Sequence, residues 1–251
     1  MPLPFPGEVR LWSAAFNESV RAPEELSRIL SVAERERAAV VPSGEVRTRF
    51  VLCRGILRSL LGRLLGLDPS RVRIELSRSG KPGLAGPEAR SGLRFSLSHT
   101  RGAALFGFCR DAEIGVDLER LRPAPWGVRV AGSFFGPAER AFLESRLSKS
   151  RDEAFLVLWT MKEAYLKARG EGLAGLRSGA EVLPAPGLRS AELRLPGDPA
   201  EAGLWTLRRV AAGKGLAASV AVRGTVRKFA VSRWTASASG GGRREVDYLE
   251  L

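Results

Sequence analysis

The chain has 251 residues, of which 44% are hydrophobic and 27% are charged. These proportions are typical of globular proteins and exclude a collagen-like, a coiled-coil or a wholly disordered chain. A chain of this length buries a large core without disulfide or metal staples, as one large domain or two small ones. Its 40 basic and 27 acidic residues give a net charge of +13, which favours an anionic partner.

Cysteine and histidine are scarce: the chain holds Cys53, Cys109 and His99 and no others of either type. Both cysteines lie in apolar stretches, so we expect buried, reduced thiols in a cytoplasmic protein. A single histidine excludes a multi-histidine metal site, and carboxylate ligands would suit Mg²⁺ or Mn²⁺. The N-terminal segment lacks signal-peptide features, and no stretch approaches the roughly 20 apolar residues of a membrane span.

In the first part of the chain, alternating apolar residues predict strands and helical spacing predicts helices. The expected strands are 8–16, 71–77, 93–98 and 103–109, and the expected helices are 22–41 and 46–66. Arg47, Arg54 and Arg58 share one face of the second helix. Strands 93–98 and 103–109 predict a hairpin, with His99 in its turn.

The second part begins with an expected strand at 113–119, followed by a loop at 120–132 that is rich in Pro and Gly. Helices are expected at 137–147 and 151–169, then strands at 190–195, 203–210, 215–223 and 226–234. Residues 237–251 are predicted to form a flexible appendage. This order indicates an α+β chain of two similar halves, divided within 110–125, and leaves the topology open.

Two acidic residues, Asp117 and Glu119, stand two apart on the strand at 113–119, so they share a face. Like charges on a half-buried face repel, and a cation, an arginine or a raised pKa must compensate. Taken alone, the pair is better explained by a solvated strand face paired with arginines than by a metal site. Glu163 and Lys167 are four residues apart in the helix at 151–169, where a surface ion pair is the plain interpretation.

The basic residues are mostly arginine, spread along the chain without a block of like charges. A GC-rich genome produces the same bias. No recognised nucleic-acid-binding motif accompanies them, so we expect no nucleic acid partner. Lys81 lies between Gly80 and Pro82, which suits an anion-binding loop or an ordinary turn. His99 stands among hydroxyl side chains, where it could donate to a phosphate or simply pack.

Four segments follow one another in the chain: 80–82 (GKP), 95–99 (FSLSH), 115–119 (GVDLE) and 159–173 (WTMKEAYLKARGEGL). This series resembles the motifs of 4′-phosphopantetheinyl transferases, in the monomeric form that activates polyketide and nonribosomal peptide synthetases. The resemblance covers roughly residues 10–235. It implies a pseudo-dimer of two α/β halves with the active site in the cleft between them. The halves would be 1–112 and 113–235, with 236–251 as a flexible tail.

The resemblance also implies residue roles. The metal ligands implied are Asp117, Glu119 and Glu163, holding Mg²⁺ on a pyrophosphate. The residues implied at coenzyme A are Arg37, Arg49, Lys81, Pro82, Ser98, His99, Lys162 and Lys167. The residues implied in catalysis are Asp117, Glu139, Glu163 and Lys167. Glu163 is the first candidate for the general base, directly or through a metal-bound water, and Glu139 is the alternative. The protein partner implied is an apo acyl or peptidyl carrier protein, whose serine receives the 4′-phosphopantetheine.

Two positions depart from the family pattern. Ser96 stands where Asn is usual and Thr100 stands where Ser is usual, and both keep a hydrogen-bonding side chain. Two other functions remain as alternatives. The first is a catalytically silent module of the same fold that binds coenzyme A or a carrier protein. The second is a basic nucleic-acid-binding protein, which the dispersed arginines disfavour.

Overall fold

The computed structural model describes residues 1–16, 23–42, 44–125, 127–172, 175, 178–235 and 246–249. The strands in these residues form two larger sheets and a small hairpin. The first sheet consists, in spatial order, of β12 (Val246–Leu249), β11 (Lys228–Arg233), β1 (Glu8–Ala15), β5 (Ala103–Arg110) and β4 (Leu93–Thr100). The second consists of β6 (Ile114–Arg120), β10 (Leu216–Arg223), β9 (Trp205–Arg209), β8 (Ser190–Arg194) and β7 (Glu181–Pro184). The hairpin pairs β2 (Ile74–Leu76) with β3 (Pro82–Leu84).

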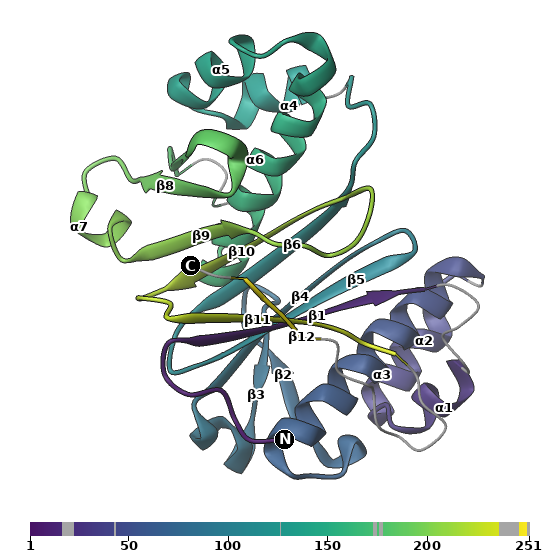
Figure 1. Ribbon diagram of the computed structural model, residues 1–251. Coiled ribbons are helices and arrows are strands. Elements are labelled where there is room, and N and C mark those ends of the chain that lie inside the picture. The colour runs from purple at the N-terminus through teal and green to yellow at the C-terminus, as the bar shows by residue number, and fades with distance from the viewer. Residues whose placement is uncertain are drawn as a thin grey trace.

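Helices cover the outer face of each sheet, so the layers run helix, sheet, sheet, helix (Figure 1). The helices beside the first sheet are α1 (Pro23–Arg28), α2 (Val32–Val40) and α3 (Glu45–Leu65). Those beside the second are α4 (Gly127–Phe134), α5 (Pro137–Glu144) and α6 (Ser148–Arg169). A short α7 (Pro199–Ala202) precedes β9.

Strand alternation divides the apolar residues of the first sheet between two cores. Leu11 and Leu105 face the second sheet and belong to a cluster that also contains Val116 and Val220. Their neighbours Trp12 and Phe106 face the opposite way and pack with residues of α3. Each large side chain buried in this way stabilises the fold by about 1.5–3 kcal/mol.

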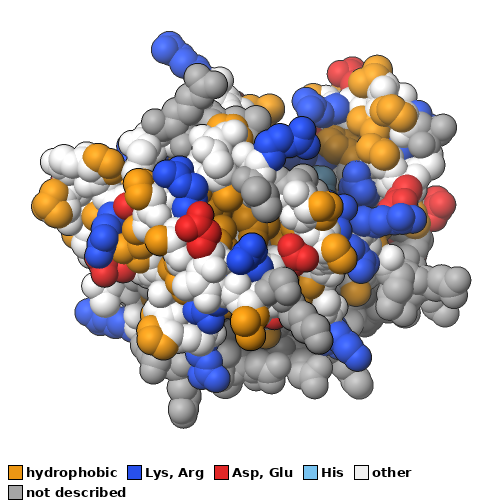
Figure 2. Space-filling model, turned by 90° about the horizontal axis from the view of Figure 1, so that it is seen from above, with side chains coloured by type: hydrophobic (Ala, Val, Ile, Leu, Met, Phe, Trp, Pro, Cys, Tyr) orange, Lys and Arg blue, Asp and Glu red, His pale blue; other side chains and the backbone are white. Residues whose placement is uncertain are grey.

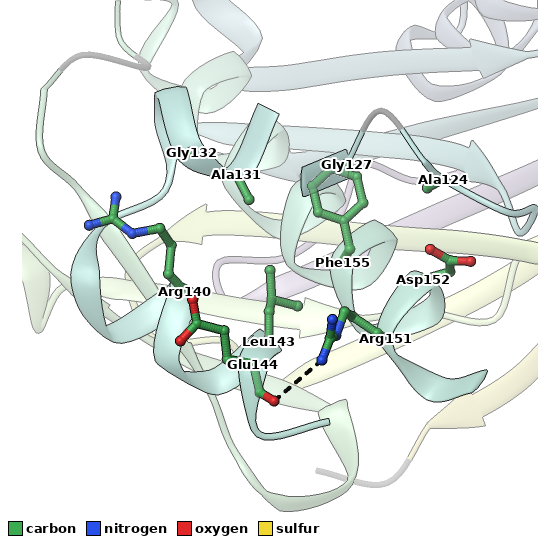
Figure 3. Close-up of a pocket in the computed structure, with 10 residues that line it drawn as sticks. All are labelled: Ala124, Gly127, Ala131, Gly132, Arg140, Leu143, Glu144, Arg151, Asp152 and Phe155. Atoms are coloured by element: carbon green, nitrogen blue, oxygen red, sulfur yellow. Dashed lines mark hydrogen bonds between the residues drawn. The ribbon is translucent and has the colours of Figure 1, made fainter. Parts of the chain in front are cut away.

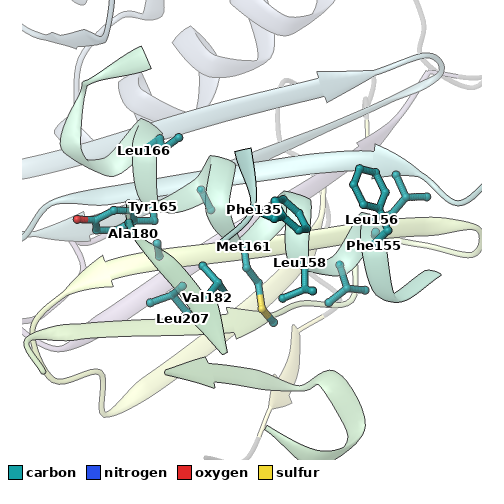
Figure 4. Packing of buried hydrophobic residues seen from close by; sticks show 14 of the residues in the cluster. Phe135, Phe155, Leu156, Leu158, Met161, Tyr165, Leu166, Ala180, Val182 and Leu207 are labelled. Carbon is teal, nitrogen blue, oxygen red and sulfur yellow. The ribbon is translucent and has the colours of Figure 1, made fainter. Parts of the chain in front are cut away.

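The third core lies between α6 and the outer face of the second sheet (Figure 4). Met161 and Leu158 of α6 are fully buried there, together with Val182 and Leu207 from the sheet. This helix is apolar over much of its surface because it is enclosed by the sheet on one side and by the α4–α5 segment on the other. The core therefore fixes the position of α6, the helix that carries Glu163 and Lys167.

The α+β class predicted from the sequence is confirmed, and most predicted strands appear within two or three residues of their expected limits. The helix expected at 22–41 is divided, because Ser31 and Glu34 form a capping box that begins α2. Part of the loop expected at 120–132 is helical, as α4. His99 lies within β4 rather than in the hairpin turn, which is Arg101–Gly102.

The chain end also differs from the prediction. Residues 246–249, expected in a flexible appendage, pair with β11 as β12, while 236–245 and 250–251 lie outside the described residues. β11 itself pairs in parallel with β1 of the first sheet. The expected half 113–235 thus supplies a strand to the sheet of the other half.

No described helix combines the length and apolar character that a membrane crossing requires.

Candidate active site

The candidate site lies where β4 and β6, the edge strands of the two sheets, pack against each other. Strand alternation directs Ser96 and Ser98 of β4 toward β6. The Ser96 hydroxyl oxygen accepts a hydrogen bond from the Val116 backbone N–H at 3.1 Å. The Ser98 hydroxyl donates to Asp117 Oδ1 at 2.9 Å. Ser96, the departure from the family pattern, therefore joins the edge strands of the two sheets.

Asp117 is the centre of this contact and is only 5% exposed. The Lys167 ammonium from α6 donates to Asp117 Oδ1 at 2.5 Å and to the Ser98 hydroxyl oxygen at 2.9 Å. This cation supplies the compensation that the sequence pattern required. The second oxygen, Asp117 Oδ2, is buried and has no hydrogen-bond partner. A buried carboxylate oxygen without a partner is costly, so this atom is poised to bind a ligand.

Two further carboxyl groups lie near Asp117. Burial, and then the negative charge of Asp117, raise the pKa of Glu163 above its ordinary value, while Lys167 lowers it. Burial and Asp117 also raise the pKa of Glu119. Glu163 Oε1 is buried without a hydrogen-bond partner. The three predicted metal ligands are therefore close enough to influence one another electrostatically.

Gly115 brings these groups together. A Cβ atom on Gly115 would overlap the Ala164 carbonyl oxygen and the Ala168 backbone nitrogen of α6. The backbones of β6 and α6 are thus in direct contact. On α6 the contact lies next to Glu163, and on β6 it lies two residues before Asp117. Within the described residues, no three His, Cys, Asp or Glu side chains are gathered closely enough to hold a metal ion as they stand. In the structure, Lys167 neutralises Asp117 instead.

Positive charge lies on the other side of β4. His99 is exposed, yet the surrounding protein lowers its pKa by desolvation, and Arg49 and Lys167 lower it further. Arg54 is mostly enclosed, and its pKa is lowered by burial and by the charge of Arg37, while Glu34 raises it. Figure 2 shows Lys and Arg side chains around the hollow in which the pale blue histidine is visible. Ser96 and Ser98 of β4 therefore face Asp117 and Lys167, while His99 faces the arginines of α3.

A cavity of about 300 Å³ opens between the β2–β3 hairpin, β4 and the end of α6. Its lining residues are Arg54, Ser79, Gly80, Lys81, Pro82, Phe95, Ser96, Leu97, Lys167, Gly170 and Gly172. Three predicted residues, Lys81, Pro82 and Lys167, thus meet here. Arg54 was not among the predicted site residues, although its helical face, shared with Arg47 and Arg58, was recognisable in the sequence.

The other two arginines of that face serve different purposes. Arg58 is 2% exposed, pairs with Glu34 of α2 and donates to backbone carbonyls that include those of Pro69 and Val72. Arg47 donates to the Ala39 and Val41 carbonyls at the end of α2. Both therefore hold the helices together, and Arg54 is the member of the face that reaches the cavity.

Lys162 and Glu139, predicted at coenzyme A and in catalysis, lie in the interior of the second half. The Lys162 ammonium donates to both carboxylate oxygens of Glu139, at 2.9 and 2.6 Å, and lies 5.1 Å from the centre of the Phe135 ring. Glu139 also accepts the backbone N–H groups of Gly136 and Val182. Their exposures are 1% and 0%, so in this structure the pair is closed to a ligand, which differs from the prediction.

A second cavity, of about 350 Å³, lies between α4, α5 and the beginning of α6 (Figure 3). Phe155 and Leu143 form much of its apolar wall, and Arg151 donates to the Glu144 carbonyl at its edge. Position 155 and position 167 are separated by roughly 18 Å along the α6 axis. None of the predicted site residues lines this cavity.

Comparison with known proteins shows the family of the chain. Residues 113–210, which include β6 and α6, match the family model of the 4′-phosphopantetheinyl transferase superfamily. The 4′-phosphopantetheinyl transferase HetI of Nostoc sp. is 37% identical over 217 residues, covering 86% of this chain and 88% of HetI. The chain belongs to the 4′-phosphopantetheinyl transferase superfamily. The similarity to HetI extends over most of the chain, well beyond the residues that the family model matches.

Two relatives from Bacillus share lower identity with this transferase. The 4′-phosphopantetheinyl transferase psf-1 of Bacillus pumilus is 31% identical over 149 residues, covering 59% of this chain and 60% of psf-1. The 4′-phosphopantetheinyl transferase Sfp of Bacillus subtilis is 29% identical over 153 residues, covering 60% of this chain and 65% of Sfp. The transferase therefore shares its family with Sfp.

Proposed function

We propose that this transferase moves 4′-phosphopantetheine from coenzyme A to a serine of an apo acyl or peptidyl carrier protein and releases adenosine 3′,5′-bisphosphate. One observation carries the proposal. At the junction of the two halves, buried oxygens of Asp117 and Glu163 lack partners, beside the ammonium of Lys167. A pyrophosphate substrate requires such a combination of metal-binding carboxylates and a cation.

Asp117, Glu119 and Glu163 are the residues proposed to hold Mg²⁺, or Mn²⁺ in its place. The two partnerless buried oxygens support this assignment, because hard divalent cations prefer carboxylate oxygens. When bound, the metal would neutralise pyrophosphate charge. It would also relieve the repulsion from Asp117 that, after burial, raises the pKa values of Glu119 and Glu163.

Coenzyme A is proposed to lie across β4, with its nucleotide in the cavity beside the β2–β3 hairpin. The proposal is supported by Pro82 and its loop, which form one wall of this cavity, and by Ser98 and Lys167, which lie on the side of Asp117. The phosphates would meet His99, Arg49 and Arg37, with Arg54 added from the structure. Lys162 is left out of this group, because Glu139 holds its ammonium in the core.

For the chemical step, we propose Glu163 as the group that accepts the carrier serine proton. The serine oxygen forms a bond to the phosphorus on the pantetheine side, and the bond from that phosphorus to the bridging oxygen breaks. The leaving bisphosphate takes the electron pair, and Lys167 and His99 lie where they would stabilise its charge. A raised pKa makes Glu163 a stronger base than an ordinary glutamate once it is ionised. Glu139, which is buried with Lys162, would stabilise the fold and would take no part in the chemical step.

The net charge of +13 suits an acidic carrier protein, because opposite charges speed the encounter of two proteins. A monomer is proposed, since one chain supplies the strands on both sides of the site. The cytoplasm is proposed as its location, where the buried free thiols of Cys53 and Cys109 stay reduced. The halves 1–112 and 113–235 remain proposed units, joined through β11.

The test is intact-protein mass spectrometry of an apo carrier protein incubated with the transferase, coenzyme A and Mg²⁺. We expect a gain of one phosphopantetheinyl group that EDTA abolishes, and a loss of at least 100-fold in rate for Asp117→Asn, the typical cost of removing one electrostatic contact to a transition state. If several unrelated carriers gain no mass while coenzyme A still binds, the protein is the silent binding module. If coenzyme A does not bind either, the proposal is wrong.

A further inference from the structure

The side chain of Lys81 joins three parts of the fold at one point. Lys81 lies in the loop before β3, and its ammonium donates to Glu113 Oε2 at 2.5 Å and to the Ala168 carbonyl oxygen at 2.5 Å. Glu113 immediately precedes β6, and Ala168 belongs to the last turn of α6. A single ammonium thus connects the β2–β3 hairpin to both elements that carry the acidic site residues.

The surroundings hold this lysine in place. The Ser77 backbone N–H donates to the Lys81 carbonyl oxygen at 2.9 Å, and the Lys81 N–H donates to the Ser77 hydroxyl oxygen at 3.1 Å. A Cβ on Gly170, whose φ is +71°, would lie 3.3 Å from Lys81 Cδ, so the aliphatic stem passes close over the end of α6. The last carbonyls of a helix lack internal partners and favour a cation, which Lys81 provides.

The position of this contact matters because Lys81 and Gly170 both line the 300 Å³ cavity. The hairpin contributes one wall of the cavity, and the end of α6 contributes another. A contact that ties these two walls together sets the distance between them. The Lys81 ammonium already has two strong acceptors here, and its side chain is 24% exposed.

We propose that Lys81 is a positioning residue: its ammonium straps the β2–β3 hairpin to β6 and α6 and so sets the width of the nucleotide cavity. It does so without contacting a ligand phosphate. This inference rests on the proposed function only in taking the nucleotide of coenzyme A as the occupant. The strap itself belongs to the protein without ligand, and its effect on the hairpin is measurable there.

The first measurement is hydrogen exchange of the protein without coenzyme A. In Lys81→Met we expect faster exchange of the amides in residues 77–84 than in the wild type, because the hairpin loses its attachment. The matched control is Glu192→Gln, which removes an exposed ion pair with Arg194 on β8 of the second sheet and should leave residues 77–84 unchanged. Unchanged exchange in Lys81→Met would overturn the proposal, whether or not coenzyme A is the substrate.

The second measurement is calorimetric binding of coenzyme A and of 3′-dephospho-coenzyme A. We expect Lys81→Met to weaken the affinity for both nucleotides by the same factor, roughly threefold to tenfold. Glu113→Gln should weaken these affinities by a smaller factor. The combined variant should bind no worse than Lys81→Met, and kcat at saturating coenzyme A should stay close to that of the wild type. A loss seen only with the 3′-phosphate present would show a direct phosphate contact, and additive losses in the combined variant would show that Lys81 and Glu113 act independently. Either result would overturn the proposal. If the wild type binds neither nucleotide, the proposed function fails while the exchange result stands.

Discussion

Gly115 of β6 and Ala164 of α6 meet backbone to backbone, with no space between them for a side chain. This contact fixes how closely Glu163 approaches Asp117. In Gly115→Ala the added methyl group must push α6 away from the sheet. We expect a loss of about 2–3 kcal/mol in the free energy of unfolding, measured in urea. We also expect a fall in transfer rate at temperatures where the variant is fully folded, because the two carboxylates separate.

The control for this change is Gly132→Ala in α4. A Cβ at Gly132 meets no atom within 4 Å, and alanine is favoured over glycine in a helix by roughly 1 kcal/mol. This variant should be as stable as the wild type or slightly more so. Equal destabilisation at both positions would contradict the close approach at Gly115.

The buried ion pair between Lys162 and Glu139 should be essential for stability. Removing one partner of a buried pair leaves the other charge without compensation, at a cost of about 3–5 kcal/mol. We therefore expect a loss of this size for Lys162→Met in urea unfolding. The exposed pair of Arg194 with Glu192 provides the comparison, since Arg194→Gln should cost at most about 1 kcal/mol. Similar small losses in both variants would argue against an enclosed pair.

The raised pKa of Glu163 predicts a dependence of stability on pH. Because its pKa in the folded protein exceeds the ordinary value of 4.5, the folded state retains a proton that the unfolded chain releases. The associated stability is present below pH 4.5 and is lost as the pH rises through the folded pKa. In EDTA, the free energy of unfolding should therefore fall more steeply with rising pH in the wild type than in Glu163→Gln. Parallel curves for the two proteins would refute this account.

His99 predicts that the affinity for coenzyme A also falls as the pH rises. Its pKa is below the ordinary 6.5, so the ring is neutral in the free protein at pH 7. A bound phosphate favours the charged ring, so binding takes up a proton and coenzyme A should bind more tightly as the pH is lowered. The measurement is the ratio of the wild-type Kd to that of His99→Gln across pH, in which titration of the ligand cancels. A ratio independent of pH would remove His99 from the phosphate site.

The sequence predicted those parts of the fold that depend on local pattern. The long helices α3 and α6 follow from their apolar spacing, and β6 follows from its apolar residues between acidic ones. The division at Ser31 was visible as a capping box, whereas α4 was hidden by the prolines and glycines before it. The strands β7 and β12 are too short to show the alternation of apolar and polar residues that predicts a strand. They form because they pair with β8 and β11.

The candidate site was predictable to a similar degree. The motifs predicted Asp117, Ser98 and Lys167 as site residues, and hydrogen bonds connect these three in the structure. No local pattern distinguishes Lys162 from Lys167, because their different surroundings arise from the packing of α5 and β7 around α6. The same is true of Lys81, whose acceptors are distant in the chain.

The parallel pairing of β11 with β1 has a consequence for how the protein is synthesised. β1 leaves the ribosome long before β11, yet the two strands are neighbours in one sheet. Until residues 228–233 emerge, one edge of β1 has unpaired backbone groups, which attract other strands. The first sheet therefore closes only after β11 has been translated. Separate expression of residues 1–112 should yield a fragment that aggregates, and adding residues 113–235 during refolding should rescue it.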